Sequence, residues 1–563
     1  MRLPSRAAMI ALVCLVGLLA CADEPPASPH RFLNTELLFA PRTDGVTLAM
    51  MAAEALQLRV HYGVGDTRDR VSDVIHAQPE RVASVELQEL PPGVRATYQV
   101  FVRRAQEADF TARDVHSFRT LHAPHAPHAP HAPHAPHAPH VPGADADRAS
   151  PSDANASGNA GESSSRQAPE LRFAIAADPH TFQNWAQHHC QARDTGWRTL
   201  DASLTRLAAS RELDFLLIGT DSAMTKCGAG CPSCEIDGVT VAAKDAVGLD
   251  DAALRYRSVF GPEVYGRVSA DLPLLYMLGD HDGERGWGSV EGACGYTLEE
   301  LAWSEEARRR TVPRRPPESP GTPASGSDRY YSVRHGALQI LVLDVLNGTT
   351  RAPTDPEAWS LGAEQLDWFE RTLAASDATF KIVFAEHLLG GLRAPEGNKA
   401  SICWKGRGGI TATENGSPRG RFVGEQAVVQ ALMKQHGAQL FVSFHDHVVA
   451  FGEKLEADGS GSGVGYLIAG QCAGPPLGEV APSPPPWSNE AWYRQAMDYD
   501  GDGVPEFETD VSGTLEKGVF FVRVVGDERI ELDYLRSDPD PTRDGERILR
   551  LLVTPDGPLI PAR

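Results

Sequence analysis

The sequence has no surplus of positive charge, which excludes one broad class of partner. It contains 53 Lys and Arg residues against 75 Asp and Glu residues, giving a formal net charge of −22 at pH 7. General affinity for nucleic acid requires a basic surface, so we expect no nucleic-acid binding. A local electropositive pocket is still compatible with this charge, and bound metal ions would create one.

Long apolar segments are also absent after the first twenty residues, so we predict no later membrane span. The start of the chain has the pattern of a bacterial export signal, with Arg2 and Arg6 before the apolar run 9–20. The run ends in Leu-Leu-Ala-Cys, which resembles a lipobox whose Cys21 carries the lipid. We therefore expect residues 1–21 to be a lipoprotein signal, and the protein to be exported and lipid-anchored to a bacterial membrane. Secretion with an unmodified Cys21 is the alternative.

Cysteine is scarce, with nine residues in a chain of 563. Outside the cytoplasm, the expected state of such residues is the disulfide. Three of them form a tight group, Cys227, Cys231 and Cys234. We interpret this group as a loop fixed by disulfides, and a zinc site is the alternative. The spacing leaves the pairing open.

The N-terminal part of the chain has an all-β pattern. Residues 32–121 contain short alternating apolar runs separated by turn residues, which predicts a small β-sandwich. The stretch 87–100 resembles a fibronectin type III domain, and more narrowly the N-terminal sandwich of purple-acid-phosphatase-like proteins.

Residues 122–168 begin with a His-Ala-Pro repeat and continue as a predicted disordered linker. The linker would leave the domains on either side without fixed contact. Weak metal capture by the repeat is the alternative to a plain spacer.

Residues 169–540 show strand-like runs that alternate with helix-like segments such as 199–209 and 363–375, a pattern typical of α/β domains. Polar clusters follow five of the strand-like runs. They are Asp178-Pro179-His180, Gly219-Thr220-Asp221, Gly279-Asp280-His281-Asp282, Glu386-His387 and His445-Asp446-His447. In open α/β sheets, ligands bind beyond the carboxyl ends of the strands. We therefore expect these side chains to converge at one edge of one sheet and to bind a pair of metal ions.

The order of the clusters resembles that of the calcineurin-like metallophosphoesterase superfamily. That family has Asp-x-His, Gly-Asp, Gly-Asn-His-(Asp/Glu), a His that is often doubled, and Gly-His-x-His. The resemblance implies an α/β (α+β) metallophosphoesterase sandwich of two β-sheets flanked by helices, preceded by the small all-β sandwich. It also implies hydrolysis of phosphate mono- or diesters at a dinuclear centre, where two metal ions activate a shared hydroxide and stabilise displacement at phosphorus.

By this resemblance, individual residues receive roles. The predicted metal ligands are Asp178, His180, Asp221, Asp280, Glu386, His387, His445 and His447. For the first metal the ligands are Asp178, His180 and His447, and for the second they are Asp280 and His445. Asp221 bridges the two ions. His281 is the predicted catalytic residue that protonates the leaving oxygen or binds the phosphate, and Asp282 orients His281.

Several positions depart from the family pattern. Asp221 is displaced by one residue, because Thr220 stands where the family has its carboxylate. The doubled His is Glu386-His387, and either residue could be the ligand. Phe444 replaces a Gly and crowds a turn. The Tyr that follows Gly-Asp in purple acid phosphatases is absent, since Ser222 follows Asp221.

These departures affect the charge of the predicted site. Four carboxylates, from Asp178, Asp221, Asp280 and Glu386, would meet two divalent or trivalent ions of the Mn, Fe or Zn class. The additional oxygens favour harder ions over Zn and weaken the attraction for a phosphate anion. We expect slow or narrowed catalysis. The alternative is a catalytically impaired member that acts as a metal- or ligand-binding surface protein.

A second metal candidate follows residue 497. Asp498, Asp500 and Asp502 alternate before Gly503, which resembles an EF-hand-like calcium loop. Position twelve of such a loop is Thr509 and not the usual Glu. An acidic surface turn is the alternative to structural calcium.

Overall fold

The computed structural model describes most of the chain outside the N-terminus, the predicted linker and several loops. The described residues are 30–123, 170–190, 195–225, 234–236, 238–241, 245–282, 297–313, 323–345, 361–387, 413–414, 417–418, 425–445, 447, 449–455, 461–474, 507–508, 516–555 and 557–561. Cys21 and the calcium candidates Asp498, Asp500 and Asp502 lie outside these residues.

The N-terminal strands form two layers around a core of their own. They are β1 (Phe32–Phe39), β2 (Val46–Ala52), β3 (Leu56–Val64), β4 (Arg70–Val71), β5 (Ile75–Ala77), β6 (Val82–Leu87), β7 (Arg95–Arg103) and β8 (Thr111–Arg119). β4, β3, β7 and β8 make one layer with β5 on β3, while β1, β2 and β6 make the other. In β3, Leu56, Leu58 and Val60 are buried and alternate with less buried polar residues, as a strand with one face toward a core requires.

A ten-stranded sheet continues from these strands into the rest of the molecule. Its order is β26-β25-β24-β23-β9-β10-β13-β1-β2-β6. The later strands are β9 (Leu171–Ala176), β10 (Phe215–Ile218), β13 (Leu274–Tyr276), β23 (Gly518–Val525), β24 (Arg529–Arg536), β25 (Arg547–Thr554) and β26 (Gly557–Pro561). β9, β10 and β13 are parallel, and β1 joins β13 at Phe39 and Leu274. The N-terminal strands are therefore in fixed contact with the α/β part, and the expectation that the linker frees them is wrong.

A seven-stranded sheet packs against the ten-stranded one. Its order is β14 (Tyr331–His335), β15 (Leu338–Val342), β16 (Phe380–Ala385), β19 (Leu440–Ser443), β21 (Gly461–Ala469), β20 (Val449–Leu455) and β22 (Phe507–Glu508). The core between the sheets includes Phe215 and Leu217 from β10 and Phe384 and Val442 from the other sheet. Two short hairpins lie apart from both sheets: β11 (Cys234–Ile236) with β12 (Val239–Val241), and β17 (Thr413–Glu414) with β18 (Ser417–Pro418).

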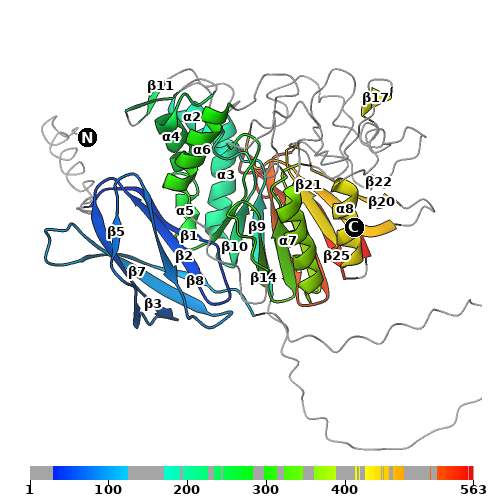
Figure 1. Cartoon of the computed structure of the whole chain (residues 1–563), viewed down its shortest axis with the longest axis horizontal. Helices are drawn as coiled ribbons and strands as arrows, with labels where there is room; N and C mark the ends of the chain where they lie inside the picture. The colour runs from blue at the N-terminus through cyan, green and yellow to red at the C-terminus, as the bar shows by residue number, and fades with distance from the viewer. Residues whose placement is uncertain are drawn as a thin grey trace, which may run out of the picture.

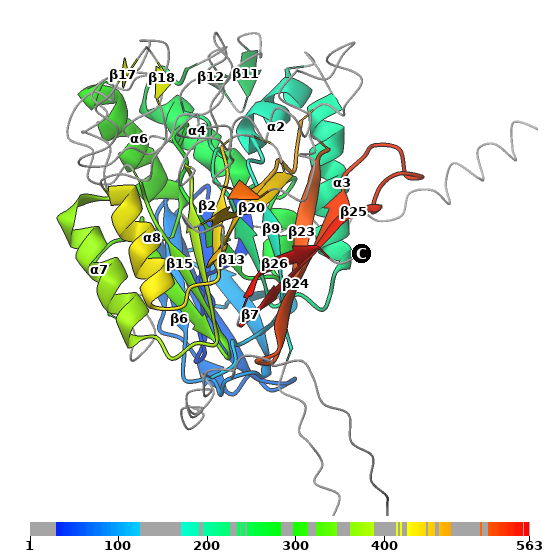
Figure 2. The ribbon, with the colours of Figure 1, turned by 90° about the vertical axis from the view of Figure 1, so that its right-hand side faces the viewer.

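Helices cover the other faces of the two sheets (Figures 1 and 2). α2 (Thr181–His189), α3 (Thr195–Ala209), α4 (Leu249–Val259), α5 (Gly266–Ser269) and α6 (Leu298–Thr311) share a core with β9, β10 and β13. α7 (Gly362–Ala375) and α8 (Glu425–Gln435) cover β15, β16 and β19, and appear together at the left of Figure 2. The predicted mixed α/β class is confirmed in this general form. None of the helices in the described ranges is long and apolar enough to cross a membrane.

Candidate metal centre

The five polar clusters converge, but they come from two sheets. The clusters that follow β9, β10 and β13 belong to the ten-stranded sheet, and those that follow β16 and β19 belong to the seven-stranded sheet. The expectation of one edge of one sheet is therefore wrong. The two sheets pack face to face, so the carboxyl ends of their parallel strands bring the clusters together.

Three overlapping groups of ligand-type atoms lie in this region, with the atoms of each group within 4.8 Å of one another. The groups are His180, Asp221 and His447; Asp280, His387 and His445; and Asp221, Asp280, Glu386 and His445. Asp221 belongs to two groups, so it lies between the His180–His447 pair and the remaining residues. Both Glu386 and His387 are brought against Asp280 and His445, and the geometry therefore keeps both as ligand candidates.

The closest contacts define two halves of the cluster. His180 Nε2 lies 3.1 Å from His447 Nε2 and 3.8 Å from Asp221 Oδ2. On the other side, His445 Nδ1 lies 3.4 Å from Glu386 Oε1 and 3.6 Å from Asp280 Oδ1. Asp178 belongs to none of the three groups, and its Oδ1 accepts a hydrogen bond of 2.8 Å from the Thr220 hydroxyl.

The backbone at these residues is unusual. Left-handed φ values occur at Asp178 (35°), His180 (42°), Asp221 (56°), His445 (65°) and His447 (58°). This conformation costs a non-glycine residue roughly 1–2 kcal/mol, and such strain concentrates at functional sites. Nothing in the sequence pattern indicates it. The left-handed residues turn the chain sharply after β9, β10 and β19, and the turns bring the polar side chains together in the candidate centre.

The side chains fit metal ions. Both carboxylate oxygens of Asp280 and of Glu386, and Oδ2 of Asp178, are buried, and the His445 ring lies 3.4 Å from Glu386 and 3.6 Å from Asp280. A buried anionic oxygen without a partner is costly, and a coordinated cation removes that cost. Carboxylate oxygens and imidazole nitrogens are the ligands that hard-to-borderline transition metals prefer.

Burial shifts the protonation of these groups when no cation is present. It raises the pKa of Asp178 to about 8 and, together with neighbouring carboxylates, raises the pKa of Asp221 well above its usual range. Burial likewise raises the pKa of Glu386. It lowers the pKa of His180 and of His387 to about 3, which keeps both rings neutral, the form that binds metals. A bound cation would favour the charged carboxylates and compete with their protons.

His281 and Asp282 lie in different environments. The His281 backbone N–H donates to Asp221 Oδ1 at 3.2 Å, and its ring Nε2 lies 3.9 Å from Asp221 Oδ2. Asp282 is buried, and its carboxylate faces the backbone of residues 222–224 instead. Asp221 therefore lies near the His281 ring, whereas the carboxylate of Asp282, expected from the resemblance to orient that ring, binds backbone N–H groups.

Phe444 packs in the core and does not block the cluster. Its ring stacks near Phe384, with centroids 6.4 Å apart. A Cβ atom added to Gly219 would lie only 3.1 Å from the Phe444 ring. The absence of a side chain at Gly219 therefore leaves room for this ring. The crowding expected at this turn is thus relieved by the neighbouring loop.

Lys517 is a residue that sequence reasoning missed. Lys517 directly precedes β23, and its charge interacts with Asp178, His180 and His447 of the cluster. Its Nζ donates to Gln471 Oε1 at 2.6 Å, and burial lowers its pKa to about 8. The lysine brings a positive charge to a region rich in carboxylates. No motif surrounds it in the sequence, so only the folded arrangement reveals it.

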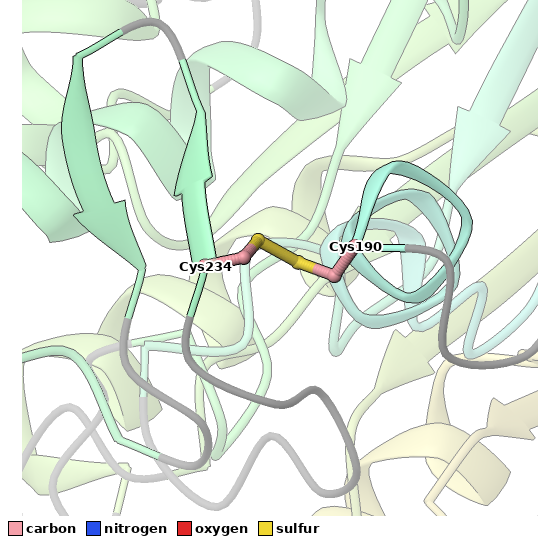
Figure 3. Close-up of a disulfide and its surroundings, with 2 residues drawn as sticks. All are labelled: Cys190 and Cys234. Carbon is pink, nitrogen blue, oxygen red and sulfur yellow. A yellow bond between two sulfur atoms is a disulfide. The ribbon is translucent and has the colours of Figure 1, made fainter.

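A disulfide fixes the helix that follows the first cluster. Cys190 at the end of α2 is bonded to Cys234 of β11, 44 residues later (Figure 3). One member of the tight cysteine group therefore pairs outside that group, while Cys227 and Cys231 lie outside the described residues. Cys472 is free and buried.

A separate cavity of about 480 Å³ lies between the N-terminal strands and the helices, with Arg95, Arg119, Arg211 and Arg267 among its lining residues. Its lining also includes Leu213, just before β10, whereas the cluster lies after that strand. The cavity is thus at the opposite end of β10 and is not part of the candidate centre.

Comparison with known proteins identifies the architecture. No protein-family model matches the sequence, and no curated protein matches it. Among solved structures, the one titled "Structure of PhoD" has a TM-score of 0.59 and 14% identity, over 96% of this chain and 93% of that chain. Purple acid phosphatase PPD1 from yellow lupin (Lupinus luteus) seeds has a TM-score of 0.54 and 12% identity, over 92% of this chain and 73% of that chain. The chain shares the fold of these two proteins. The predicted mixed α/β fold with two β-sheets is confirmed at that level.

Proposed function

We propose that the protein is a metal-dependent phosphoesterase that hydrolyses phosphate mono- or diesters. One observation carries this proposal. Two groups of ligand-type residues, with buried carboxylates and partly buried imidazoles, share Asp221 at the carboxyl edge of a fold that is similar to PhoD and to a purple acid phosphatase. The polar side chains have few other partners in the described structure, which supports binding of cations there.

The two halves of the cluster would each hold one metal ion. His180, His447 and Asp221 would bind the first, with Asp178 beside them, and Asp221 would bridge to the second. Asp280 and His445 would bind the second ion, completed by Glu386 or His387. The ions would supply Lewis-acid stabilisation of charge at phosphorus and an activated nucleophile at neutral pH.

His281 is the residue we propose for proton transfer to the leaving oxygen. Its ring lies at the edge of the cluster, with a side chain that is 13% exposed, so a substrate can reach it. The hydrogen bond from its backbone to Asp221 fixes its distance from the proposed bridge. A positioned general acid contributes about 10²–10⁴-fold to the rate of such a reaction.

A second candidate function is binding without efficient hydrolysis. The observation that favours it is the additional buried carboxylate of Glu386, which adds negative charge where a phosphate would have to bind. Lys517 offsets part of this charge, and for that reason we place hydrolysis first.

Purified protein assayed with Mn, Fe or Zn on a chromogenic aryl phosphate tests the proposal. We expect hydrolysis, and we expect His281→Ala to lower kcat by about 100-fold or more while elemental analysis finds unchanged metal content. His76→Ala, at an exposed position of β5, is the matched control. Absence of bound metal would rule out the proposal, and bound metal with no hydrolysis of any ester would favour the second candidate.

We also propose that the protein is exported and lipid-anchored through Cys21. The pattern of residues 1–21 supports this location. The Cys190–Cys234 disulfide supports it as well, because disulfides persist in oxidising compartments. The calcium loop at Asp498, Asp500 and Asp502 stays a prediction that the same elemental analysis would test.

A further inference from the structure

The carboxylate of Asp282 accepts hydrogen bonds from the backbone of residues 222–224, from the backbone of Gly279 and from the side chain of Tyr276. The residue is 2% exposed. Its oxygens accept hydrogen bonds from the backbone N–H groups of Ser222 (3.1 Å), Ala223 (2.6 Å), Met224 (3.0 Å) and Gly279 (3.3 Å), and from the hydroxyl of Tyr276 (3.2 Å). Three successive N–H groups that converge on one anion form a compact anion-binding turn.

Further hydrogen bonds join the same two segments, residues 219–225, called here the Asp221 loop, and residues 279–282. The Thr225 N–H donates to the His281 carbonyl at 2.7 Å, and the His281 N–H donates to Asp221 Oδ1 at 3.2 Å. A Cβ atom added to Gly279 would lie 2.4 Å from the Asp221 nitrogen, so only glycine permits this approach. The Asp221 loop and residues 279–282 are therefore one connected unit.

This unit explains how the Asp221 carboxylate reaches the candidate centre although it stands one residue later than in the family pattern. Thr220, at the position expected for the carboxylate, turns its hydroxyl to Asp178 at 2.8 Å. Asp221 reaches its location with a φ of 56°, and Met224 has a φ of 51°. Such conformations persist only where the surrounding structure fixes them. The three N–H groups that Asp282 binds, those of residues 222–224, directly follow Asp221 and include the strained Met224.

We propose that Asp282 is a positioning residue that fixes the Asp221 loop and so holds the Asp221 carboxylate between the two groups of ligands. The inference rests on the proposed function in taking those groups as metal ligands. In this proposal Asp282 positions the Asp221 carboxylate and does not orient the His281 ring. Asp282 then acts on metal affinity through the backbone, without contact with metal or substrate.

Metal affinity, measured by competition with a chromogenic chelator, tests the proposal without relying on activity. Asp282→Asn replaces an acceptor oxygen by an amide that cannot accept from the facing N–H groups. We expect about 10–100-fold weaker binding of Mn, the range found when partners of metal ligands are removed. The matched control is Asp214→Asn. Asp214 is also buried, accepts an N–H from Arg172 at 2.9 Å, and lies at the opposite end of β10. We expect less than a twofold change there.

A double-mutant cycle separates this role from the orienting role. If Asp282 acts through Asp221, Asp282→Asn should cause no further loss of Mn affinity in an Asp221→Asn background. A role through His281 predicts unchanged Mn affinity together with an altered pH profile of kcat, and that result would overturn the proposal. Additive losses in the cycle would also overturn it.

Tyr276→Phe covers the case in which Asp282→Asn does not fold. It removes one hydrogen bond to Asp282 Oδ2, and we expect Mn affinity to fall by about two- to fivefold with the fold retained. Unchanged affinity in Tyr276→Phe would then count against the proposal. Failure of the proposed function looks different: the wild-type protein would bind Mn, and lose it in Asp282→Asn, while hydrolysing no phosphate ester.

Discussion

At the scale of single residues, buried charge is the dominant feature of this protein. Asp178, Asp280 and Glu386 place carboxyl groups inside the molecule, and Lys517 brings a cation close to Asp178. The count of four carboxylates against two metal ions therefore overstates the negative charge of the site. Lys517 lowers the electrostatic barrier to a phosphate anion, which makes hydrolysis more compatible with the extra carboxylate than the sequence alone implied.

A buried carboxylate outside the centre gives a pH prediction. Burial raises the pKa of Asp214 to about 6, above its unfolded value of 3.8. The stability it contributes as a neutral acid is fully present below about pH 4 and is lost as the pH rises through 6. Over that window wild-type protein should lose up to about 3 kcal/mol from this group, and Asp214→Asn should not.

This difference is measured by urea unfolding of both proteins at about pH 4.5, 5.5, 6.5 and 7.5, which covers the pH range over which Asp214 titrates. A chelator is present throughout, so titration of the metal-ligand residues is common to both proteins and cancels. Identical pH slopes would show that Asp214 titrates normally in the folded state.

At the scale of elements, α2 connects the candidate centre to a disulfide. Its first residue follows His180, and its end carries Cys190, which is bonded to Cys234 of β11. The Phe182 N–H also donates to the Ser222 carbonyl at 2.9 Å, so the helix contacts the Asp221 loop. The disulfide therefore restrains an element that positions one half of the centre.

Removal of this disulfide should lower stability. The bridge closes a separation of 44 residues, for which chain entropy gives about 4 kcal/mol. We expect the double variant Cys190→Ser, Cys234→Ser to lose roughly 2–4 kcal/mol in unfolding free energy, measured by guanidinium denaturation. Reductant should destabilise the wild-type protein but not the variant. Equal effects of reductant on both would point to another disulfide.

The sequence predicted the elements of the site better than their arrangement. Strand-like runs and the polar residues after them identified β9, β10, β13, β16 and β19, and the helix predicted over 363–375 is α7. These strands are buried on both faces, as when Phe215 and Leu217 face one core and Leu216 and Ile218 the other. Such apolar runs carry no sign of which sheet a strand joins. The left-handed backbone and the role of Asp282 depend on contacts between distant segments, which spacing does not encode.

At the scale of the whole molecule, the N-terminal strands are part of the main structure. β1 extends the ten-stranded sheet, and the Tyr98 hydroxyl donates to the Ala270 carbonyl at 2.7 Å. Where the predicted linker begins, His122 is also in contact, since the Gly336 N–H donates to its carbonyl at 3.2 Å. The protein is thus one connected body over these residues, and the proposed anchor at Cys21 would hold all of it near the membrane.

The proposed anchor predicts a change of compartment. Expressed in a bacterial host, full-length protein should fractionate with membranes and be released by detergent, whereas Cys21→Ser should lose lipid labelling and appear mostly in soluble fractions. Labelling with a fatty-acid analogue and fractionation measure this. Labelling of Cys21→Ser equal to wild type would contradict the assignment. Cys472→Ser, at a buried free cysteine, is the control.

The origin of the ligands in two separate sheets has a mechanical consequence. An ion bound by residues after both β10 and β19 would join the two layers of the sandwich at one edge, in addition to the apolar core between them. Metal loading would then restrict the opening of both layers, and amide hydrogen exchange in β10 and β19 would slow together on loading. Without metal, the two layers would open more often. Resistance to proteases and loss of folded protein during storage would then depend on the metal content of the preparation.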